Sequence, residues 1–225
     1  MSIDISSIRL TAEDGHTLDA YRASPDGEAR GGVVVIQEIF GIDRHVRRDV
    51  DRWASLGYEA IAPSMFDRVD PGFEAEHNPD GVAAGVANMR ATPMEQALSD
   101  IAAVRDVLAP MGKVFIVGYC YGGSMTWLSA AELDGFAAAS SYYGSMVLAN
   151  AAKRPRCPTI IHLGRQDAGI PCDEVKAAVQ AANPGVPVYI YDDAGHGFNN
   201  EDPARYSEAS ATLARQRTLD LFAKA

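Results

Sequence analysis

The amino-acid sequence predicts an α/β fold, with a mostly parallel sheet that helices cover on both faces. Two observations support this prediction. Apolar segments of strand character alternate along the chain with segments of helical period, which is typical of βαβ units. The run Gly32-Val-Val-Val-Ile36 is also apolar at every position after its glycine, as strands buried on both faces are.

Turn and capping signals define the elements of the first sixty residues. Asp14-Gly15 predicts a tight turn that joins two strands into an antiparallel hairpin. Asp43 can cap a helix that runs to about residue 56, and Gly57 is placed to end it. The strands expected here are 5–10, 17–23, 32–36 and 58–62.

Prolines and glycines interrupt any period over residues 64–91. We therefore expect an irregular excursion there, which either shapes the substrate site or is a plain surface loop. The tetrapeptide Thr92-Pro93-Met94-Glu95 has the spacing of a capping box with proline at the first helical position. It predicts a helix that continues to about residue 108.

The second half of the chain repeats the strand and helix alternation without a linker, an internal repeat or a low-complexity tract. We expect one domain over residues 1–225. The strands expected here are 114–117, 136–142, 159–163 and 187–191. The helices expected here are 121–132, 172–182 and 203–223.

Composition narrows the class of protein. The chain has 20 Lys and Arg against 30 Asp and Glu, which gives a formal net charge of -10. This charge disfavours nucleic-acid binding, and an anionic substrate would need a local arginine to overcome the repulsion. No apolar run reaches the ~20 residues of a membrane span, and the N-terminus lacks the features of a signal peptide. We therefore expect a cytoplasmic protein without a membrane partner. Three cysteines and five histidines without ligand spacing predict neither a disulfide framework nor a metal, and no cofactor is expected.

The segment that carries most chemical information is Gly118-Tyr-Cys120-Tyr-Gly122, which follows an apolar strand and precedes a helix. This G-x-C-x-G spacing is that of a nucleophile elbow, with cysteine as the nucleophile. The two glycines remove side chains that would collide across a sharp turn. Alone the pattern is weak evidence, because a cysteine in a glycine-rich turn is often an inert apolar residue.

Two residues downstream strengthen the hypothesis. Asp167 and His196 each follow an apolar strand, at the edge where open α/β sheets build their sites. Their order after Cys120 is nucleophile, acid, base, as this kind of site requires. His196 would take the thiol proton and Asp167 would fix the imidazole tautomer. Either residue alone would be better explained as an ordinary loop residue.

The segment Gln37-Glu38-Ile39-Phe40-Gly41 directly follows the first buried strand. In such a site this loop gives a backbone N–H to the oxyanion hole, here from Ile39, and the second donor is Tyr121. Glu38 has either a role in the site or an ordinary place at a helix terminus facing water. His162 alternates with apolar neighbours and is expected to be a hydrogen-bonded core histidine.

Taken together, these segments resemble the dienelactone hydrolase family. The matching motifs are Q-E-I-F-G at 37–41, G-Y-C-Y-G-G at 118–123, S-Y-Y-G at 141–144, D-A-G-I-P at 167–171 and A-G-H-G-F at 194–198. The resemblance implies an eight-stranded α/β-hydrolase fold, a Cys120–His196–Asp167 triad and an acyl-enzyme. It also implies that Glu38 holds the resting thiol proton, and that the protein is a monomer.

Substrate recognition is where the sequence departs from that family, whose members hold a carboxylate with arginines. Asn199 and Asn200 stand after His196 where an arginine is expected. Arg90, or alternatively Arg68, is the candidate for the other arginine. Phe40, Tyr143 and Asn200 are the further candidates for substrate contacts.

Three functions remain open at this point. The first is hydrolysis of a small enol-lactone such as dienelactone. The second is hydrolysis of another small ester or thioester by the same triad. The third is a non-catalytic binding protein of the same fold, which the complete set of triad residues disfavours.

Overall fold

The computed structural model describes residues 3–202 and 204–225. Its strands form an eight-stranded, mostly parallel sheet in the order β1-β2-β4-β3-β5-β6-β7-β8, so the predicted α/β fold is confirmed. The chain comprises two compact units, residues 1–116 and 117–225, and the boundary falls within β5. The expected single domain stays a prediction.

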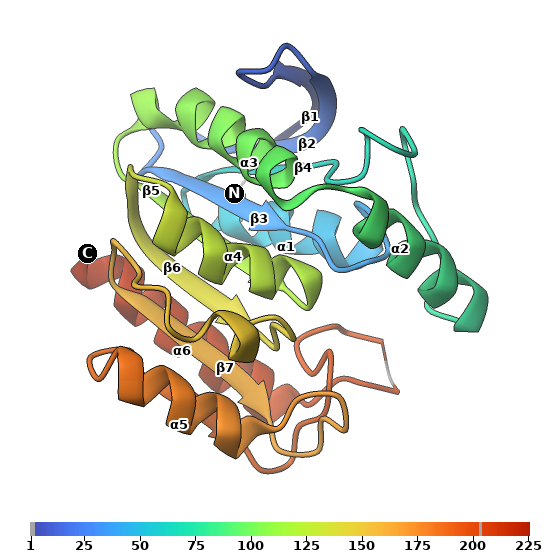
Figure 1. Cartoon of the computed structure of the whole chain (residues 1–225). Helices are drawn as coiled ribbons and strands as arrows, with labels where there is room; N and C mark the ends of the chain where they lie inside the picture. The colour runs from blue at the N-terminus through green and yellow to red at the C-terminus, as the bar shows by residue number, and fades with distance from the viewer. Residues whose placement is uncertain (1–2, 203) are drawn as a thin grey trace. The chain divides into compact units, whose positions relative to one another are not determined.

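The first unit is built on strands β1 to β4. Its elements are β1 (Ile3–Thr11), β2 (Thr17–Pro25), β3 (Gly32–Ile36), α1 (Arg44–Ser55), β4 (Glu59–Pro63), α2 (Pro79–Ala91), α3 (Met94–Leu108), a 3-10 turn (Ala109–Met111) and the start of β5 (Val114–Tyr119). Strands β1 and β2 form the predicted hairpin, and β2 pairs with β4 in antiparallel orientation. Strands β3 and β4 are parallel and buried throughout. Helices α1 and α3 lie on opposite faces of these strands (Figure 1).

Helix α1 begins and ends where the sequence predicts. The Asp43 carboxylate accepts the Val46 N–H at 2.9 Å, which satisfies one of the donors that a helix start leaves open. Gly57 follows the helix with φ +91°, a conformation that glycine adopts without strain. The buried face of α1 includes Val50 and Trp53.

The prediction that residues 64–91 are irregular is wrong for residues 79–91, which form α2. Asn78 caps this helix by accepting the Gly81 N–H at 2.9 Å, and Pro79 occupies its first turn. The two glycines of the helix allow close packing. A Cβ on Gly81 would lie 1.9 Å from the Glu76 carbonyl oxygen. Glycine in this helix therefore reflects close backbone contact and does not act as a helix breaker.

The capping box predicted at Thr92 is also wrong. Helix α3 begins after Pro93, and no side chain caps it. The Thr92 hydroxyl instead donates to the Asn88 carbonyl oxygen at 2.9 Å, at the end of α2. Because α2 was not predicted, the alternative use of this hydroxyl was not visible in the sequence.

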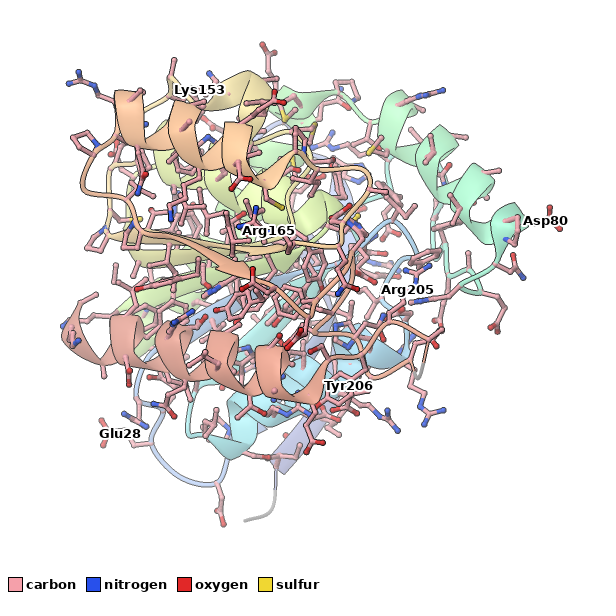
Figure 2. All side chains as sticks on the ribbon, turned by 90° about the horizontal axis from the view of Figure 1, so that it is seen from below. Glu28, Asp80, Lys153, Arg165, Arg205 and Tyr206 are labelled. Atoms are coloured by element: carbon pink, nitrogen blue, oxygen red, sulfur yellow. The ribbon has the colours of Figure 1, made fainter. Side chains whose placement is uncertain are left out.

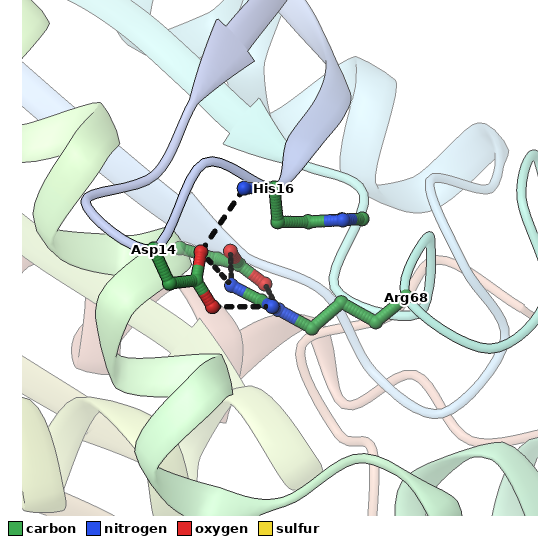
Figure 3. A network of polar contacts seen from close by, with 4 residues as sticks. Asp14, His16 and Arg68 are labelled. Atoms are coloured by element: carbon green, nitrogen blue, oxygen red, sulfur yellow. Dashed lines mark hydrogen bonds and ion pairs between the residues drawn. The ribbon is translucent and has the colours of Figure 1, made fainter.

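Arg68 lies in an ion-pair network of the first unit, drawn in Figure 3. Its guanidinium donates to Asp14 at 2.7 and 3.1 Å and to Asp100 at 2.9 and 2.8 Å. The Arg68 and Asp100 side chains are buried, and Asp14 also accepts the His16 N–H. This double pairing connects the β1–β2 turn to α3, and it argues against Arg68 as the arginine that holds a substrate carboxylate.

The second unit is built on parallel strands. Its elements are the end of β5, α4 (Tyr121–Glu132), β6 (Phe136–Tyr142), a 3-10 turn (Leu148–Asn150), β7 (Thr159–Gly164), α5 (Cys172–Ala182), β8 (Val188–Tyr191) and α6 (Glu208–Lys224). Strand β7 is parallel to both β6 and β8. Helices α4 and α5 lie on one face of these strands and α6 on the other (Figure 1).

Helix α6 begins later than predicted. Pro203, the expected first residue, lies outside the described residues, and Glu208 is the first residue in helical conformation. Before it, the Asp202 carbonyl oxygen accepts the N–H groups of Arg205 and Tyr206 at 2.9 and 3.0 Å. These bonds form a turn, so the expected helical period is not found over residues 204–207.

Within the described ranges, no helix has the length and apolar character that crossing a bilayer requires. The same ranges contain no cluster of three His, Cys, Asp or Glu side chains arranged as metal ligands.

Candidate active site

Cys120 occupies a strained turn between β5 and α4. Its backbone has φ +54° and ψ −112°, a sparsely populated conformation for a residue with a side chain, which costs about 1–3 kcal/mol. Its N–H donates to the Tyr142 carbonyl oxygen at 3.0 Å, and its own carbonyl oxygen accepts the Ser124 N–H at 3.1 Å. The thiol therefore sits at the N-terminus of α4, where the helix dipole favours a negative charge.

Glycines on both sides allow this turn to form. A Cβ on Gly118 would lie 2.2 Å from the Gly122 carbonyl oxygen. A Cβ on Gly123 would lie 2.1 Å from the Tyr142 carbonyl oxygen, the group that accepts the Cys120 N–H. Both positions therefore exclude any larger residue.

Asp167 and His196 form a close pair. The Asp167 Oδ2 atom lies 2.6 Å from His196 Nδ1, and its Oδ1 atom accepts the Gly169 N–H at 2.9 Å. The Asp167 side chain is only 2% exposed, whereas that of His196 is 34% exposed. The carboxylate is therefore fixed inside the loop after β7, and the imidazole reaches toward solvent.

The Cys120 side chain also influences the ionisation of His196. Burial disfavours the charged imidazole, but the interactions with Asp167 and Cys120 outweigh it and raise the pKa of His196 to about 10. With Nδ1 against the carboxylate, Nε2 is the ring nitrogen left for proton exchange. Such a ring can move a proton between a thiol and a leaving group.

Tyr143 lies against the imidazole. Its ring meets that of His196 edge to face, with centroids 5.2 Å apart at 61°. The residue is fully buried and has φ +39°, so its backbone is held in a second uncommon conformation. Its N–H donates to the His162 carbonyl oxygen at 2.8 Å. Sequence reasoning expected it to contact substrate, and the structure places it beside His196.

Two serines that orient the elbow were missed. Ser141 donates to the Gly123 carbonyl oxygen at 2.7 Å, and Ser124 accepts the Met146 N–H at 3.0 Å while donating to the Cys120 carbonyl oxygen at 3.4 Å. Ser141 is the first residue of the S-Y-Y-G motif, and Ser124 directly follows the elbow motif. A search for hydroxyls adjacent to those motifs could have found both.

The loop after β3 is buried within the first unit. Glu38, Ile39 and Phe40 each expose less than a tenth of their surface. The Phe40 ring stacks on His77 with centroids 3.9 Å apart, and its carbonyl oxygen accepts the Ala75 N–H at 3.0 Å. The segment 73–77 therefore covers this loop, and no local pattern in the sequence predicts this contact.

The other predicted residues have different surroundings. Arg90 is exposed near the end of α2, and Tyr121 is the first residue of α4, whose first-turn N–H groups point out of the helix. Asn200 is buried, and its side-chain oxygen accepts the Asp202 N–H at 3.2 Å. Cys120, Tyr121, Tyr143, Asp167, His196 and Asn200 belong to residues 117–225, and Glu38, Ile39, Phe40 and Arg90 belong to residues 1–116.

Comparison with known proteins supports the motif analysis. The chain is 35% identical over 244 residues to a Salmonella typhimurium protein named "Putative carboxymethylenebutenolidase", with 100% of this chain and 88% of that protein covered. It is 31% identical to the carboxymethylenebutenolidase of Pseudomonas putida, with 96% and 95% covered. The crystal structure of a "Putative Dienelactone Hydrolase" from Klebsiella pneumoniae superposes with a TM-score of 0.88 at 31% identity and covers 100% of both chains. The dienelactone hydrolase family model matches residues 18–225. The chain thus belongs to the dienelactone hydrolase family.

Proposed function

We propose that this member of the family hydrolyses a small lactone or ester through an acyl-enzyme on Cys120. Membership in the family makes the chain a lactone or ester hydrolase. The observation that supports the finer proposal is the imidazole of His196, which lies 2.6 Å from the Asp167 carboxylate and whose pKa both Asp167 and Cys120 raise. A non-catalytic binding protein would have no use for such an arrangement on a strained turn.

In the proposed first half-reaction, Cys120 reacts as a thiolate beside the protonated ring of His196, and its sulfur attacks the carbonyl carbon of the lactone. The carbonyl π electrons move onto oxygen, where the Tyr121 N–H stabilises the negative charge. When the carbonyl re-forms, the ring C–O bond breaks, and the imidazolium gives its proton to the leaving oxygen. The product is a thioester on Cys120 that keeps the opened chain.

In the second half-reaction, His196 removes a proton from water, and the resulting hydroxide attacks the thioester carbon. The C–S bond breaks, and the thiolate leaves beside the protonated ring of His196, which restores the starting pair. Asp167 keeps the ring in the tautomer with hydrogen on Nδ1 and stabilises its charged form in both halves.

The residues of the first unit keep the roles that the resemblance implies. We propose that Ile39 gives the second oxyanion donor, that Glu38 holds the resting thiol proton, and that Phe40 and Arg90 contact the substrate. We further propose that the chain acts as one domain, as a monomer and in the cytoplasm, without cofactor, nucleic acid or membrane.

The test replaces the nucleophile and compares it with another cysteine. We expect Cys120→Ala to abolish turnover of a chromogenic ester or enol-lactone while circular dichroism stays unchanged. Cys157 is a free cysteine of the same unit, half-buried and far from the elbow in sequence, so Cys157→Ala is the matched control and should keep full activity. Full activity in Cys120→Ala would show that the proposed mechanism is wrong.

A substrate that carries a carboxylate is favoured over a neutral one by Arg205, on the loop before α6 (Figure 2). Its side chain lies across Gly197, the residue after His196, with Cδ 3.3 Å and a guanidinium nitrogen 3.7 Å from the place where a Cβ on Gly197 would sit. In a chain of net charge -10, a cation here offsets the general repulsion of an anionic substrate.

Matched enol-lactones with and without a carboxylate distinguish the substrate classes. We expect a higher kcat/KM for the acid, and we expect Arg205→Gln to reduce that preference by about tenfold, as loss of a charge-assisted hydrogen bond would. A preference for the neutral compound would instead favour another ester or thioester as the substrate.

A further inference from the structure

A buried hydrogen-bond network centres on Thr218 in α6. The Thr218 Oγ1 atom lies 2.8 Å from Ser140 Oγ, 2.9 Å from the Tyr142 hydroxyl and 3.3 Å from His162 Nε2. All four side chains are buried, and Thr218, Ser140 and His162 have no exposed surface. One hydroxyl of a C-terminal helix therefore joins two strands of the second unit, β6 and β7.

The hydrogens available limit the direction of these hydrogen bonds. The Thr218 hydroxyl donates to the Ala214 carbonyl oxygen at 3.0 Å, and its two lone pairs can accept from two of its three other neighbours. Burial, together with the charge of Arg217, lowers the pKa of His162 to about 3, so this ring is neutral and has one N–H.

Tyr191 extends the network on the other side of His162. Its hydroxyl accepts from Arg217 at 3.1 Å and lies 2.9 Å from His162 Nδ1. Both ring nitrogens of His162 therefore have a hydroxyl partner, and a continuous hydrogen-bonded network runs from Arg217 to Thr218.

The same network holds the dipeptide Tyr142–Tyr143, which contacts both the proposed nucleophile and the proposed base. The Tyr142 carbonyl oxygen accepts the Cys120 N–H at 3.0 Å, and the Tyr143 ring packs against His196. The Tyr142 hydroxyl is bonded to Thr218, and the Tyr143 N–H to the His162 carbonyl oxygen. A shift of the dipeptide would therefore move the sulfur and the imidazole relative to each other.

We propose that Thr218 is a positioning residue, which fixes the separation of Cys120 and His196 through the Tyr142–Tyr143 dipeptide. This inference rests on the proposed function of Cys120. It predicts that a change on α6, with no contact to substrate, alters the ionisation of the thiol. A residue that only stabilised the fold would change the unfolding midpoint and leave the remaining folded enzyme with normal chemistry.

The experiment compares three variants of the full chain with wild type. Thr218→Val keeps the shape of the side chain and removes the hydroxyl, whereas Thr218→Ser restores it. The control is Ser129→Ala, because Ser129 Oγ on α4 is buried and has no hydrogen-bond partner in the described part of the chain. Iodoacetamide alkylation of the Cys120 peptide is measured against pH by mass spectrometry, and kcat and KM are measured on a chromogenic ester.

We expect Thr218→Val to lower kcat about tenfold with KM nearly unchanged, because small misplacements of reacting groups reduce rates strongly. We also expect it to shift the alkylation midpoint of Cys120 upward by roughly half a pH unit or more. Thr218→Ser and Ser129→Ala should match wild type in both measurements.

An unchanged alkylation profile and kcat in folded Thr218→Val would overturn the inference, and so would failure of Thr218→Ser to restore them. These results would leave the proposed function standing. The proposed function fails by a different result, namely full hydrolytic activity in Cys120→Ala, so the two failures can be distinguished.

Discussion

Glycine usually makes a protein less stable than alanine at the same position, and the strained backbone of Cys120 predicts the opposite order there. Alanine at this position keeps the conformation at φ +54° and ψ −112° and the cost of about 1–3 kcal/mol that it imposes on a residue with a Cβ. Glycine adopts such angles without that cost, but loses about 0.4–1 kcal/mol through the greater freedom of its unfolded chain. Cys120→Gly should therefore be more stable than Cys120→Ala by about 0.5–2 kcal/mol.

Urea unfolding of both variants, with the slope checked for equality, measures this difference directly. A parallel thermal scan should show a shift of roughly 2–4 °C per kcal/mol for a chain of this size. The control is Ala130→Gly, within the regular part of α4, which should lower stability by about 1 kcal/mol or more. If Cys120→Gly proves less stable than Cys120→Ala, the turn is not strained and the argument from backbone geometry is wrong.

Three further predictions concern charge and packing. The raised pKa of His196, about 10, means that the folded state binds the imidazole proton more tightly than the unfolded state. The resulting stabilisation is complete below about pH 6.5 and is lost as the pH rises through 10. The urea midpoint of wild type should therefore fall over that interval, and the midpoint of His196→Gln should fall less. A Cβ on Gly85 would lie 2.1 Å from a backbone oxygen, so Gly85→Ala should destabilise the fold by about 1–3 kcal/mol in urea, whereas Gly185→Ala, with nothing within 4 Å, should be nearly neutral. Arg68→Ala would leave the buried carboxylate of Asp100 without its partner and should lower the unfolding free energy by about 3–5 kcal/mol; a midpoint equal to wild type would show that the pair contributes nothing.

The sequence was sufficient for elements with a local cause. Asp43 and Gly57 predict both ends of α1, because a cap and a positive φ are properties of a few adjacent residues. The order of Cys120, Asp167 and His196 likewise predicted a site, and the structure places the last two side chains 2.6 Å apart.

Features that depend on distant backbone could not be predicted. Gly81 looks like a helix breaker in the sequence, and only the carbonyl oxygen of Glu76 beside it explains why glycine is required within α2. Thr218 looks like an ordinary residue of a long helix, since its partners Ser140 and His162 lie more than fifty positions earlier. Tertiary contacts determine which residue is required at these positions, so the local sequence pattern does not predict it.

The contact between α2 and the loop after β3 is made by main chain on both sides. At Gly85 the helix backbone lies so close to Ile39 that a single Cβ would collide with its carbonyl oxygen. Contacts of this kind have no side chain that could change rotamer and absorb a displacement. Helix α2 therefore cannot move independently of this loop. Any tilt of α2 about Gly85 must also displace the peptide group of Ile39, so a ligand that shifts one segment would also shift the other.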